Sequence, residues 1–383
     1  MVPVRPRDAQ AAGAAKSLRF RGLTARTPLL IGLVAVALAL LPAAGAAGKV
    51  PKGFFAITEG GPQAQADLQQ MHDINVKSMR LNLNWRSIQP QKGGPYNWPD
   101  ARVTALANNG IAPAFILYSA PKWATHSDYQ GVPPLKGAAK TAWNHFVTNA
   151  VKRYKPGGAF WDSHPSVPDH PAKSWQIWNE PNLPKYFARA GTTQLRQVKN
   201  APKAYGKFVK STDKTIHRAD KHGKVILAGL SGNPKTKKMA PEKFLKKFFK
   251  VKKVEKHFDA AALHPYAPKI KQFKERITKV RKAMKKGGAK KKKLWLTEVG
   301  WGSANDGFSL NKGLAGQAKM LKKSFKATLK MRKKAKIQRV YWFDWRDPKP
   351  MANPPCSFCP SSGLLRNDRS PKPAYKKFKG FTT

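Results

Sequence analysis

The sequence predicts a single α/β domain, a (β/α)8 barrel, and three observations lead to that prediction. Eight strand-like segments follow one another along the chain, and a segment with a helical pattern follows each of them. This alternation is typical of a parallel sheet whose crossover connections are helices. The strand-like segments are nearly continuous apolar runs, as expected for strands buried on both faces. The 383 residues also suffice for one barrel, which commonly needs about 250 residues.

The strand-like segments are short apolar, aromatic-rich runs, and the helical segments between them are longer and carry most of the charge. In chain order, the expected strands cover residues 54–58, 77–85, 111–118, 175–179, 224–230, 257–264, 294–298 and 338–343. The expected helices cover residues 63–75, 100–109, 141–154, 193–221, 242–250, 270–286, 313–334 and 373–378. No internal repeat, long linker or shift in composition marks a second domain.

Residues 1–47 have the order of basic, apolar and small residues that characterises a cleavable signal peptide. Basic residues precede an apolar run from Leu29 to Leu41, and the small residues 42–47 follow it. We therefore expect a catalytic or binding domain of residues 48–383 that is secreted or associated with the cell surface. An uncleaved membrane anchor is the alternative, although the apolar run is short for a bilayer span. No later segment of the sequence is long and apolar enough to cross a membrane.

The net charge of the chain is +53, and lysine supplies most of the excess. Loss of the six basic residues and one acidic residue in 1–47 would leave +48 on the remaining domain. Lysine runs such as Lys246-Lys247, Lys285-Lys286 and Lys290–Lys293 fall within or beside expected helices, so solvated helix faces are one interpretation. Binding of an anionic cell-envelope polymer or acidic polysaccharide is the other. Nucleic acid would bind nonspecifically, because no nucleic-acid-binding module is recognisable in the sequence.

The chain has two cysteines, Cys356 and Cys359, in the segment Cys-Ser-Phe-Cys. In a reducing compartment this spacing would suggest redox chemistry or half of a zinc site. The sequence has no second cysteine pair, and the export signal implies an oxidising environment. We therefore expect a small structural disulfide.

Two aromatic-rich strand segments, 118 residues apart, each end in a glutamate. Residues 174–182 carry Glu180, and residues 294–301 carry Glu298. A carboxylate at the end of a buried strand is unfavourable unless it has a partner or a use. In α/β barrels the carboxyl ends of the strands form the active-site face, and cleavage of a glycosidic bond needs two carboxyl groups. Taken singly, either glutamate could be a cap or an ion-pair partner, but together they predict sugar chemistry.

Other chemistries lack sequence support. The sequence has no His-Glu-x-x-His motif, no calcium-loop pattern and no completed zinc site, so we expect no metal. It has no Gly-x-Gly-x-x-Gly or phosphate-binding loop, so we expect no nucleotide cofactor. It also lacks the Gly-x-Ser-x-Gly turn of serine hydrolases.

The motifs around the two glutamates resemble those of the clan A glycoside hydrolases, which are TIM barrels. Trp178–Asn182 is similar to the clan's Asn-Glu-Pro signature on strand four, and Thr297–Trp301 is similar to its nucleophile segment on strand seven. His264-Pro265-Tyr266 resembles its His-x-Tyr element, and Gly363–Tyr375 resembles its closing segment. The resemblance spans roughly residues 54–378 and is nearest in character to family 39 and family 5-like bacterial members, including exopolysaccharide-cleaving ones.

The resemblance implies a retaining glycoside hydrolase that cleaves O-glycosidic bonds of a polysaccharide or oligosaccharide by double displacement. Glu180 would be the general acid and then the general base, and Glu298 would be the nucleophile. Their carboxyl groups would lie about 5–5.5 Å apart, and two like charges so close disfavour double ionisation. The residues expected to bind or orient the substrate are Arg80, Asn179, His264, Tyr266 and Trp342.

The expected roles of these residues differ. Asn179 would bond the sugar 2-hydroxyl, and Arg80 and Tyr266 would hold Glu298 in place. His264 would bind sugar or orient an acid, with a structural role as the alternative. Aromatic rings near strand ends could stack on sugars or belong to the core; these rings are Trp85, Trp123, Trp301, Trp342 and Trp345.

Two other functions are compatible with the sequence. A sugar hydroxyl could replace water in the second step, which would make the enzyme a transglycosylase. A non-catalytic barrel could instead bind anionic cell-envelope polysaccharide through its lysine-rich surface.

Overall fold

The computed structural model describes residues 50–383 except residues 62, 192–194, 235, 353 and 355. The expected signal peptide, residues 1–47, lies outside the described residues, so its cleavage and the export of the chain remain predictions. In the described part, no helix combines the length and the apolarity that a membrane span requires.

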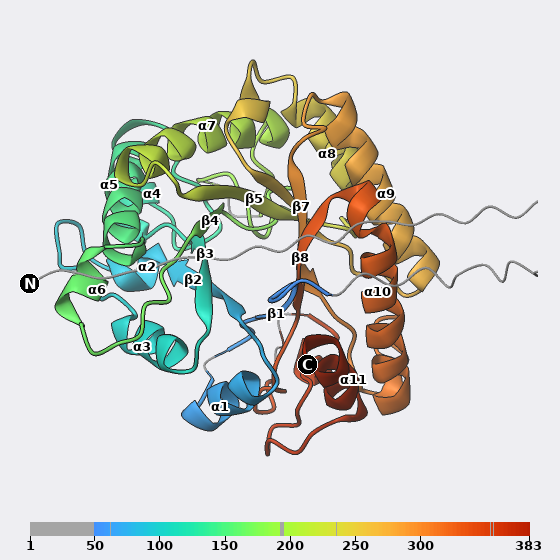
Figure 1. The fold of residues 1–383 in the computed structure, drawn as a ribbon. Helices are drawn as coiled ribbons and strands as arrows, with labels where there is room; N and C mark the ends of the chain where they lie inside the picture. Colours follow the sequence, from blue (N-terminus) through green and yellow to red (C-terminus); the bar gives the residue numbers. More distant parts are fainter. Residues whose placement is uncertain (1–49, 62, 192–194, 235, 353, 355) are drawn as a thin grey trace, which may run out of the picture. The chain divides into compact units, whose positions relative to one another are not determined.

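Eight parallel strands form a closed barrel in the order β1 to β8, and β1 closes the ring by pairing with β8. The predicted (β/α)8 barrel is thereby confirmed (Figure 1). The strands are β1 (Phe55–Thr58), β2 (Ser78–Asn84), β3 (Ala112–Tyr118), β4 (Ser174–Ile177), β5 (Lys224–Ser231), β6 (Ala260–His264), β7 (Lys293–Val299) and β8 (Ile337–Trp342).

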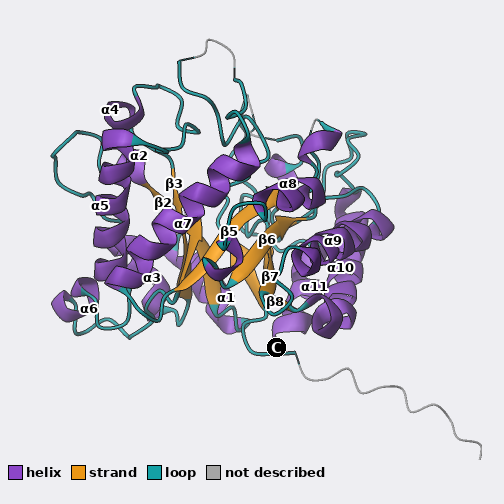
Figure 2. Cartoon of the chain, turned by 90° about the horizontal axis from the view of Figure 1, so that it is seen from above, coloured by secondary structure: helices purple, strands orange, loops and turns teal. Residues whose placement is uncertain are grey.

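One long helix follows each strand, and Figure 2 shows the helices outside the ring of strands. These helices are α1 (Gln65–Asp73), α3 (Asp100–Asn108), α5 (Gly137–Tyr154), α7 (Ala201–Ala219), α8 (Pro241–Phe248), α9 (Ile270–Lys286), α10 (Gly313–Ala335) and α11 (Pro373–Thr382). Among the described residues, the connections also contain three short α-helices, namely α2 (Trp85–Ile88), α4 (Lys122–Thr125) and α6 (Ala159–Ser163), and three single-turn 3-10 helices. The sequence did not predict these short helices, because four or five residues are too few to show a helical period.

Several predicted boundaries were wrong: α5 begins at Gly137 and not at residue 141, β6 begins at Ala260 and not at residue 257, and α11 ends at Thr382 and not at residue 378. Two further shifts lie around β4. The helix after β4 begins at Ala201 and not at residue 193, because Asn200 has a φ of +50° and Pro202 occupies the first turn. Proline favours the first turn of a helix, where its missing N–H is not needed. Strand β4 ends at Ile177 and not at Asn179, because Trp178 turns into the left-handed region with a φ of +72°.

The apolar core has two parts, since successive side chains of a strand point to opposite faces of the sheet. The larger part lies between strands and helices, where Phe55 of β1 stacks on Phe325 of α10 with ring centroids 3.9 Å apart. The smaller part is a separate cluster of inward-facing residues; its members are Ala56, Ala114, Ile226, Ala260, Ala262, Trp295 and Tyr341. Four of these seven residues are alanines, so two aromatic rings supply most of the volume of that layer.

The predicted disulfide is confirmed. Cys356 and Cys359 are bonded, with Cα atoms 5.3 Å apart. The bond closes a small loop after β8, and Phe358 inside that loop is buried against Tyr266 with ring centroids 4.8 Å apart.

Candidate active site

The loop after β4 brings Glu180 to the carboxyl end of the barrel through an unusual backbone path. Trp178 and Glu180 have φ values of +72° and +34°, which residues other than glycine rarely adopt. Such conformations cost about 1–3 kcal/mol each and persist only where the surroundings enforce them. Backbone strain of this kind is concentrated at functional sites.

Burial of Trp178 offsets this cost. The Trp178 ring is fully buried, and its indole N–H donates to the carbonyl oxygen of Tyr186. Tyr118 packs against the ring edge-on, with centroids 4.8 Å apart. Asn182 ties the other end of the loop to β5, since its side chain accepts from the N–H of Ser231 at 2.9 Å and donates to the Ser231 carbonyl oxygen at 2.9 Å.

Glu180 and Glu298 face each other across a shared histidine. Nδ1 of His264 lies 2.8 Å from Oε1 of Glu180 and 3.3 Å from Oε2 of Glu298. One carboxylate oxygen of each glutamate and a ring nitrogen of His264 all lie within 4.8 Å of one another. Both glutamate side chains keep some access to solvent, with exposed fractions of 10% for Glu180 and 17% for Glu298. Both carboxyl groups therefore remain in contact with solvent.

Arg80 on β2 joins Glu298 to the β4 segment. Its guanidinium donates to Oε1 of Glu298 at 2.8 Å, to Oδ1 of Asn179 at 3.1 Å and to Oε1 of Gln176 at 2.9 Å. The Arg80 side chain is only 3% exposed, so it is held rigidly among these acceptors. A buried guanidinium needs such partners, and its planar fork fixes their relative geometry.

Tyr266 holds the second oxygen of Glu298. Its hydroxyl donates to Oε2 at 3.0 Å. Burial and the nearby charges of Glu298 and Glu180 raise the pKa of Tyr266 well above its usual range. The phenol therefore keeps its proton and acts as a donor over the whole physiological pH range.

The surroundings of Glu298 favour its ionised form. Burial by itself raises the pKa of Glu298, but electrostatic attraction by His264 and Arg80, with hydrogen bonds from Arg80 and Tyr266, lowers it further than burial raises it. The net effect is a pKa below the usual value. Glu298 is thus a carboxylate whose two oxygens are fixed by a cation and a hydroxyl, as a nucleophile requires.

Three residues that support His264 were not predicted from the sequence. Nε2 of His264 lies 3.1 Å from Oγ1 of Thr297, and the Thr297 carbonyl oxygen accepts from the Thr58 hydroxyl at 2.6 Å. Gly229 of β5 leaves room for the imidazole, because a Cβ there would lie 1.9 Å from Nε2. A glycine within a strand pattern is a known signal of close approach, and it could have pointed to this position.

Gln176 and Tyr186 also border the site. No feature of the sequence indicated either residue. Gln176 accepts from Arg80 and donates to the Trp178 carbonyl oxygen at 3.1 Å. Tyr186 is half-buried, and burial together with the charges of Glu180 and Glu298 raises its pKa. Tyr186 therefore belongs to the same electrostatic environment as the two glutamates.

The structure corrects the expectation for Trp342. Its ring is fully buried against Phe325 and Trp301, and its indole N–H donates to the Ser362 carbonyl oxygen at 3.3 Å. Since no face of this ring is open, it belongs to the core. The same holds for three other tryptophans that could have stacked on sugars, namely Trp85, Trp301 and Trp345. Trp123 is only partly buried, and its indole N–H donates to the Gln89 carbonyl oxygen at 2.9 Å.

His264 is likewise too deeply buried to touch a sugar. Its exposed fraction is 0%, and both ring nitrogens have protein partners. Of the two expected roles, the structure therefore rules out sugar contact and retains contact with an acid, Glu180. Asn179, Arg80 and Tyr266 are brought together around Glu298 as described above.

Glu180, His264 and Glu298 also offer the ligand types that metal ions use. Both oxygens of Glu298 already accept hydrogen bonds, one of them from the Arg80 guanidinium. A metal ion bound there would lie beside this fixed positive charge, which is unfavourable. The donor set suits proton transfer and nucleophilic attack better than metal binding.

A protein-family model described as "Glycosyl hydrolase catalytic core" matches residues 95–372 of the chain. That range covers well over half of the sequence and includes Glu180, His264 and Glu298. No curated protein sequence matches the chain.

Several solved structures share the fold. A family 39 glycoside hydrolase from Bacteroides cellulosilyticus WH2 has a TM-score of 0.61 and 19% identity over 86% of this chain, which spans 63% of that protein, less than two thirds of its length. A monomeric beta-xylosidase from Caulobacter crescentus CB15 has a TM-score of 0.59 and 17% identity, and the match covers 85% of this chain and 67% of that protein. GH5_18 from Streptomyces cattleya, solved in complex with GlcNAc, has a TM-score of 0.60 and 14% identity, and the match covers 83% of this chain and 73% of that protein. At these identities the likeness establishes the barrel fold.

Proposed function

Because the chain belongs to the glycosyl hydrolase catalytic-core family, we propose that it is a retaining glycoside hydrolase whose reaction is carried by Glu180 and Glu298. The observation that supports this most is the approach of the two carboxylates to within 4.8 Å across His264. Retaining enzymes keep their carboxyl groups about 5–5.5 Å apart, whereas inverting enzymes separate them by about 6.5–9.5 Å to admit water.

In the first step, an oxygen of Glu298 attacks the anomeric carbon of the sugar. The glycosidic C–O bond breaks, and the leaving oxygen takes a proton from the carboxylic acid of Glu180. The products are a covalent glycosyl ester on Glu298 and a free alcohol or sugar. This step requires ionised Glu298 and protonated Glu180. The Arg80 guanidinium, 2.8 Å from Oε1 of Glu298, favours the ionised form of the nucleophile.

In the second step, the Glu180 carboxylate takes a proton from water as the water oxygen attacks the anomeric carbon. The ester bond to Glu298 breaks, Glu298 leaves as a carboxylate, and the two inversions give net retention. A sugar hydroxyl in place of water would give transglycosylation by the same proton transfers. Analysis of the products at high acceptor concentration separates the two.

The other residues act by positioning. Arg80 and Tyr266 hold the two oxygens of Glu298, and Arg80 also orients Oδ1 of Asn179, which leaves the Asn179 amide N–H groups to donate to a sugar hydroxyl. A hydrogen bond to the 2-hydroxyl that strengthens in the transition state contributes several kcal/mol in such enzymes. His264 orients the acid, Glu180.

Azide rescue of alanine variants tests these roles. With a panel of dinitrophenyl glycosides, whose leaving group needs no proton, Glu180→Ala should form the glycosyl enzyme and release it slowly. Azide needs no general base, so it should restore turnover and give a glycosyl azide of retained configuration. Glu298→Ala should lack the covalent step, and azide attack in its place should give the inverted product.

Glu59→Ala is the matched control, because Glu59 also follows a strand but is paired with Arg102 at 3.1 Å. It should retain the wild-type rate if it folds. Wild-type activity in both Glu180→Ala and Glu298→Ala would overturn the proposal.

We also propose that the enzyme is exported after cleavage near residue 47 and acts on a polysaccharide or oligosaccharide outside the cell. The support is the residue order of segment 1–47. Amino-terminal sequencing of the protein from culture medium is the test. A start near residue 48 is expected, and recovery of the intact chain only from inside the cell would contradict it.

A further inference from the structure

A pocket of about 790 Å³ opens at the end of the barrel opposite to the two glutamates. Its walls include the first residues of several strands, among them Ser78 of β2, Ser174 of β4 and Lys224 of β5. Glu180 and Glu298 lie at the other ends of parallel strands, so the pocket and the candidate active site are on opposite faces. The volume is within the range of about 300–1,000 Å³ that is typical of small-molecule sites.

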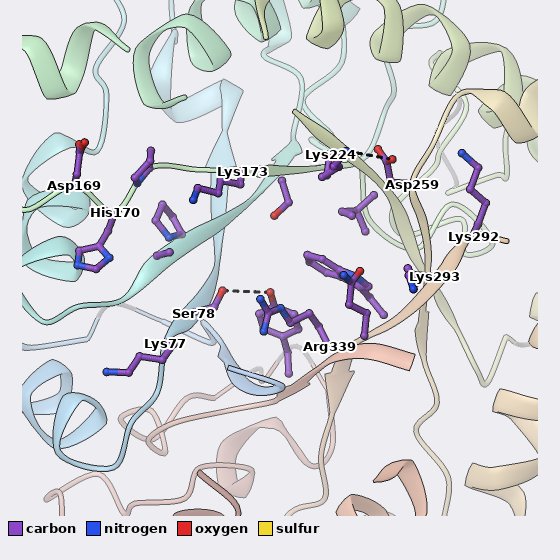
Figure 3. Close-up of a pocket in the computed structure, with 18 of the residues that line it drawn as sticks. Lys77, Ser78, Asp169, His170, Lys173, Lys224, Asp259, Lys292, Lys293 and Arg339 are labelled. Atoms are coloured by element: carbon purple, nitrogen blue, oxygen red, sulfur yellow. Dashed lines mark hydrogen bonds and ion pairs between the residues drawn. The ribbon is translucent and has the colours of Figure 1, made fainter. Parts of the chain in front are cut away.

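Positive charge is concentrated around this pocket. Seven lysines and arginines line it, against two aspartates; the basic residues are Lys77, Lys173, Lys224, Lys291–Lys293 and Arg339. Figure 3 shows the labelled basic residues distributed around the pocket, within strands or just before them. Basic groups that surround a hollow focus the field on a ligand inside it, unlike lysines spread over a convex helix face.

Most of this charge is not neutralised within the protein. Of the two aspartates, Asp259 lies 3.9 Å from Lys224 and offsets one of the seven positive charges. Lys173, Lys291 and Lys293 are exposed and make no ion pair with any acid among the described residues. The excess of positive charge also affects the imidazole of His170. Burial and the charge of Lys77 lower its pKa, although the charge of the adjacent Asp169 raises it.

The floor of the pocket is neutral, and its two large aromatic rings are buried. Trp295 is only 8% exposed and Tyr341 only 1%, and the Tyr341 hydroxyl lies 3.3 Å from the Ser78 hydroxyl. Single-stranded nucleic acids and neutral sugars are held largely by stacking on exposed aromatic faces. A ligand of this pocket is therefore recognised by its negative charges.

We propose that this pocket is a second carbohydrate site that binds an acidic segment of a polysaccharide through its carboxylate or sulfate groups. A glycan is favoured over a nucleic acid because the chain belongs to a glycosyl hydrolase family and because the two large aromatic rings of the pocket, Trp295 and Tyr341, are buried. Binding there would hold an acidic polymer on the enzyme and raise the local concentration of chain segments near the opposite face. The site is independent of the reaction mechanism proposed above.

Titration of the purified protein with an oligogalacturonate tests the site by binding alone. At about 0.15 M salt, the wild-type protein should bind the oligomer and should not bind its methyl-esterified form, which has the same length but no charge. Lys173→Gln/Lys291→Gln/Lys293→Gln should weaken binding about tenfold. The control Lys322→Gln/Lys323→Gln/Lys326→Gln removes the same charge from exposed positions of α10 and should weaken it less than about twofold.

Equal losses in the two triple variants would overturn the proposal, because binding would then follow net charge and not the pocket. A DNA oligonucleotide of equal charge that bound as tightly and depended as strongly on the pocket lysines would overturn the choice of a glycan. Hydrolysis of a small neutral aryl glycoside should be unchanged in both variants, so failure of the pocket proposal and failure of the proposed activity are distinguishable.

Discussion

Nδ1 of His264 lies 2.8 Å from Oε1 of Glu180, and the imidazole is fully buried. The position of the proposed acid, Glu180, therefore depends on the imidazole of His264. Water does not reach this imidazole, so a water molecule cannot take over its contact with Glu180. The same nitrogen lies 3.3 Å from Oε2 of Glu298, so His264 is the physical link between the two carboxyl groups.

Replacement of His264 should affect the acid more than the nucleophile. In His264→Gln, kcat/KM for a glycoside with a poor leaving group should fall by about 10²–10³, because general acid catalysis contributes about 10²–10⁴. A dinitrophenyl glycoside of the same sugar needs no proton and should lose less than about tenfold. Equal losses on both substrates would show that His264 acts through overall structure and not through Glu180.

The pH dependence of activity should shift when Arg80 is removed. Arg80 helps to hold the pKa of Glu298 below its usual value, so Arg80→Met should raise that pKa and move the acid limb of the kcat/KM profile to higher pH. Because the pKa of Glu298 is lower in the folded protein than in the unfolded chain, where it is about 4, ionised Glu298 stabilises the fold at pH values above about 4. That stability is lost as pH falls through the folded pKa.

Arg102→Met is a matched control for this experiment, since it breaks a comparable pair with Glu59, at 3.1 Å, that does not involve Glu298. Its acid limb should coincide with that of the wild type. An unchanged limb in Arg80→Met would mean that Arg80 does not set the charge of the nucleophile.

A methyl group at position 229 should displace His264. The added Cβ of Gly229→Ala would lie 1.9 Å from Nε2 of His264 and 2.6 Å from Oγ1 of Thr297. We expect a loss of about 1–3 kcal/mol in the free energy of unfolding and a lower kcat/KM, measured by denaturant titration and steady-state kinetics. Gly380→Ala, which meets no atom within 4 Å, should be neutral or slightly stabilising. Wild-type stability in Gly229→Ala would show that the pocket for His264 is not tight.

The parts of this molecule that follow from local pattern were predictable. Helix α9 begins at Ile270 and ends at Lys286 as the sequence predicts, because its apolar residues recur with a helical period. Glu298 and Glu180 were predictable because a charge at the end of an apolar run is conspicuous. Cys356 and Cys359 were predictable as a disulfide because the chain offers no other cysteine partners.

Features that depend on three-dimensional surroundings were not predictable. Trp342 lies at the end of β8 like a site residue, but the direction of its ring depends on its packing against Phe325 of α10 and Trp301. Gly229 and Thr297 matter only because β5 and β7 both approach His264 of β6. Trp178 ends β4 early because its left-handed backbone is enforced by aromatic neighbours that lie far away in the sequence.

Asp344 should make stability depend on pH. Burial raises the pKa of Asp344 to about 7, whereas the unfolded value is about 4. Between these values the folded state keeps a proton that the unfolded state has released, so stability falls as pH rises through the window and is constant above it. The rise from 3.8 to about 7 corresponds to about 4 kcal/mol.

Asp344→Asn cannot ionise, so its stability relative to the wild type should increase from pH 5 to pH 8 when both are unfolded in urea. Asp162→Asn, at an exposed position, should show no such trend. A constant difference between Asp344→Asn and the wild type across this range would contradict the assignment.

Trapping of the covalent intermediate tests most directly whether Glu298 is the nucleophile of a retaining reaction. The protein is incubated with a panel of 2-deoxy-2-fluoroglycosides that carry good leaving groups, and the peptides are examined by mass spectrometry. We expect a glycosyl adduct on Glu298 of the wild-type protein and no adduct in Glu298→Gln. An adduct on Glu180, or hydrolysis of the matching natural glycoside with inverted configuration, would contradict it.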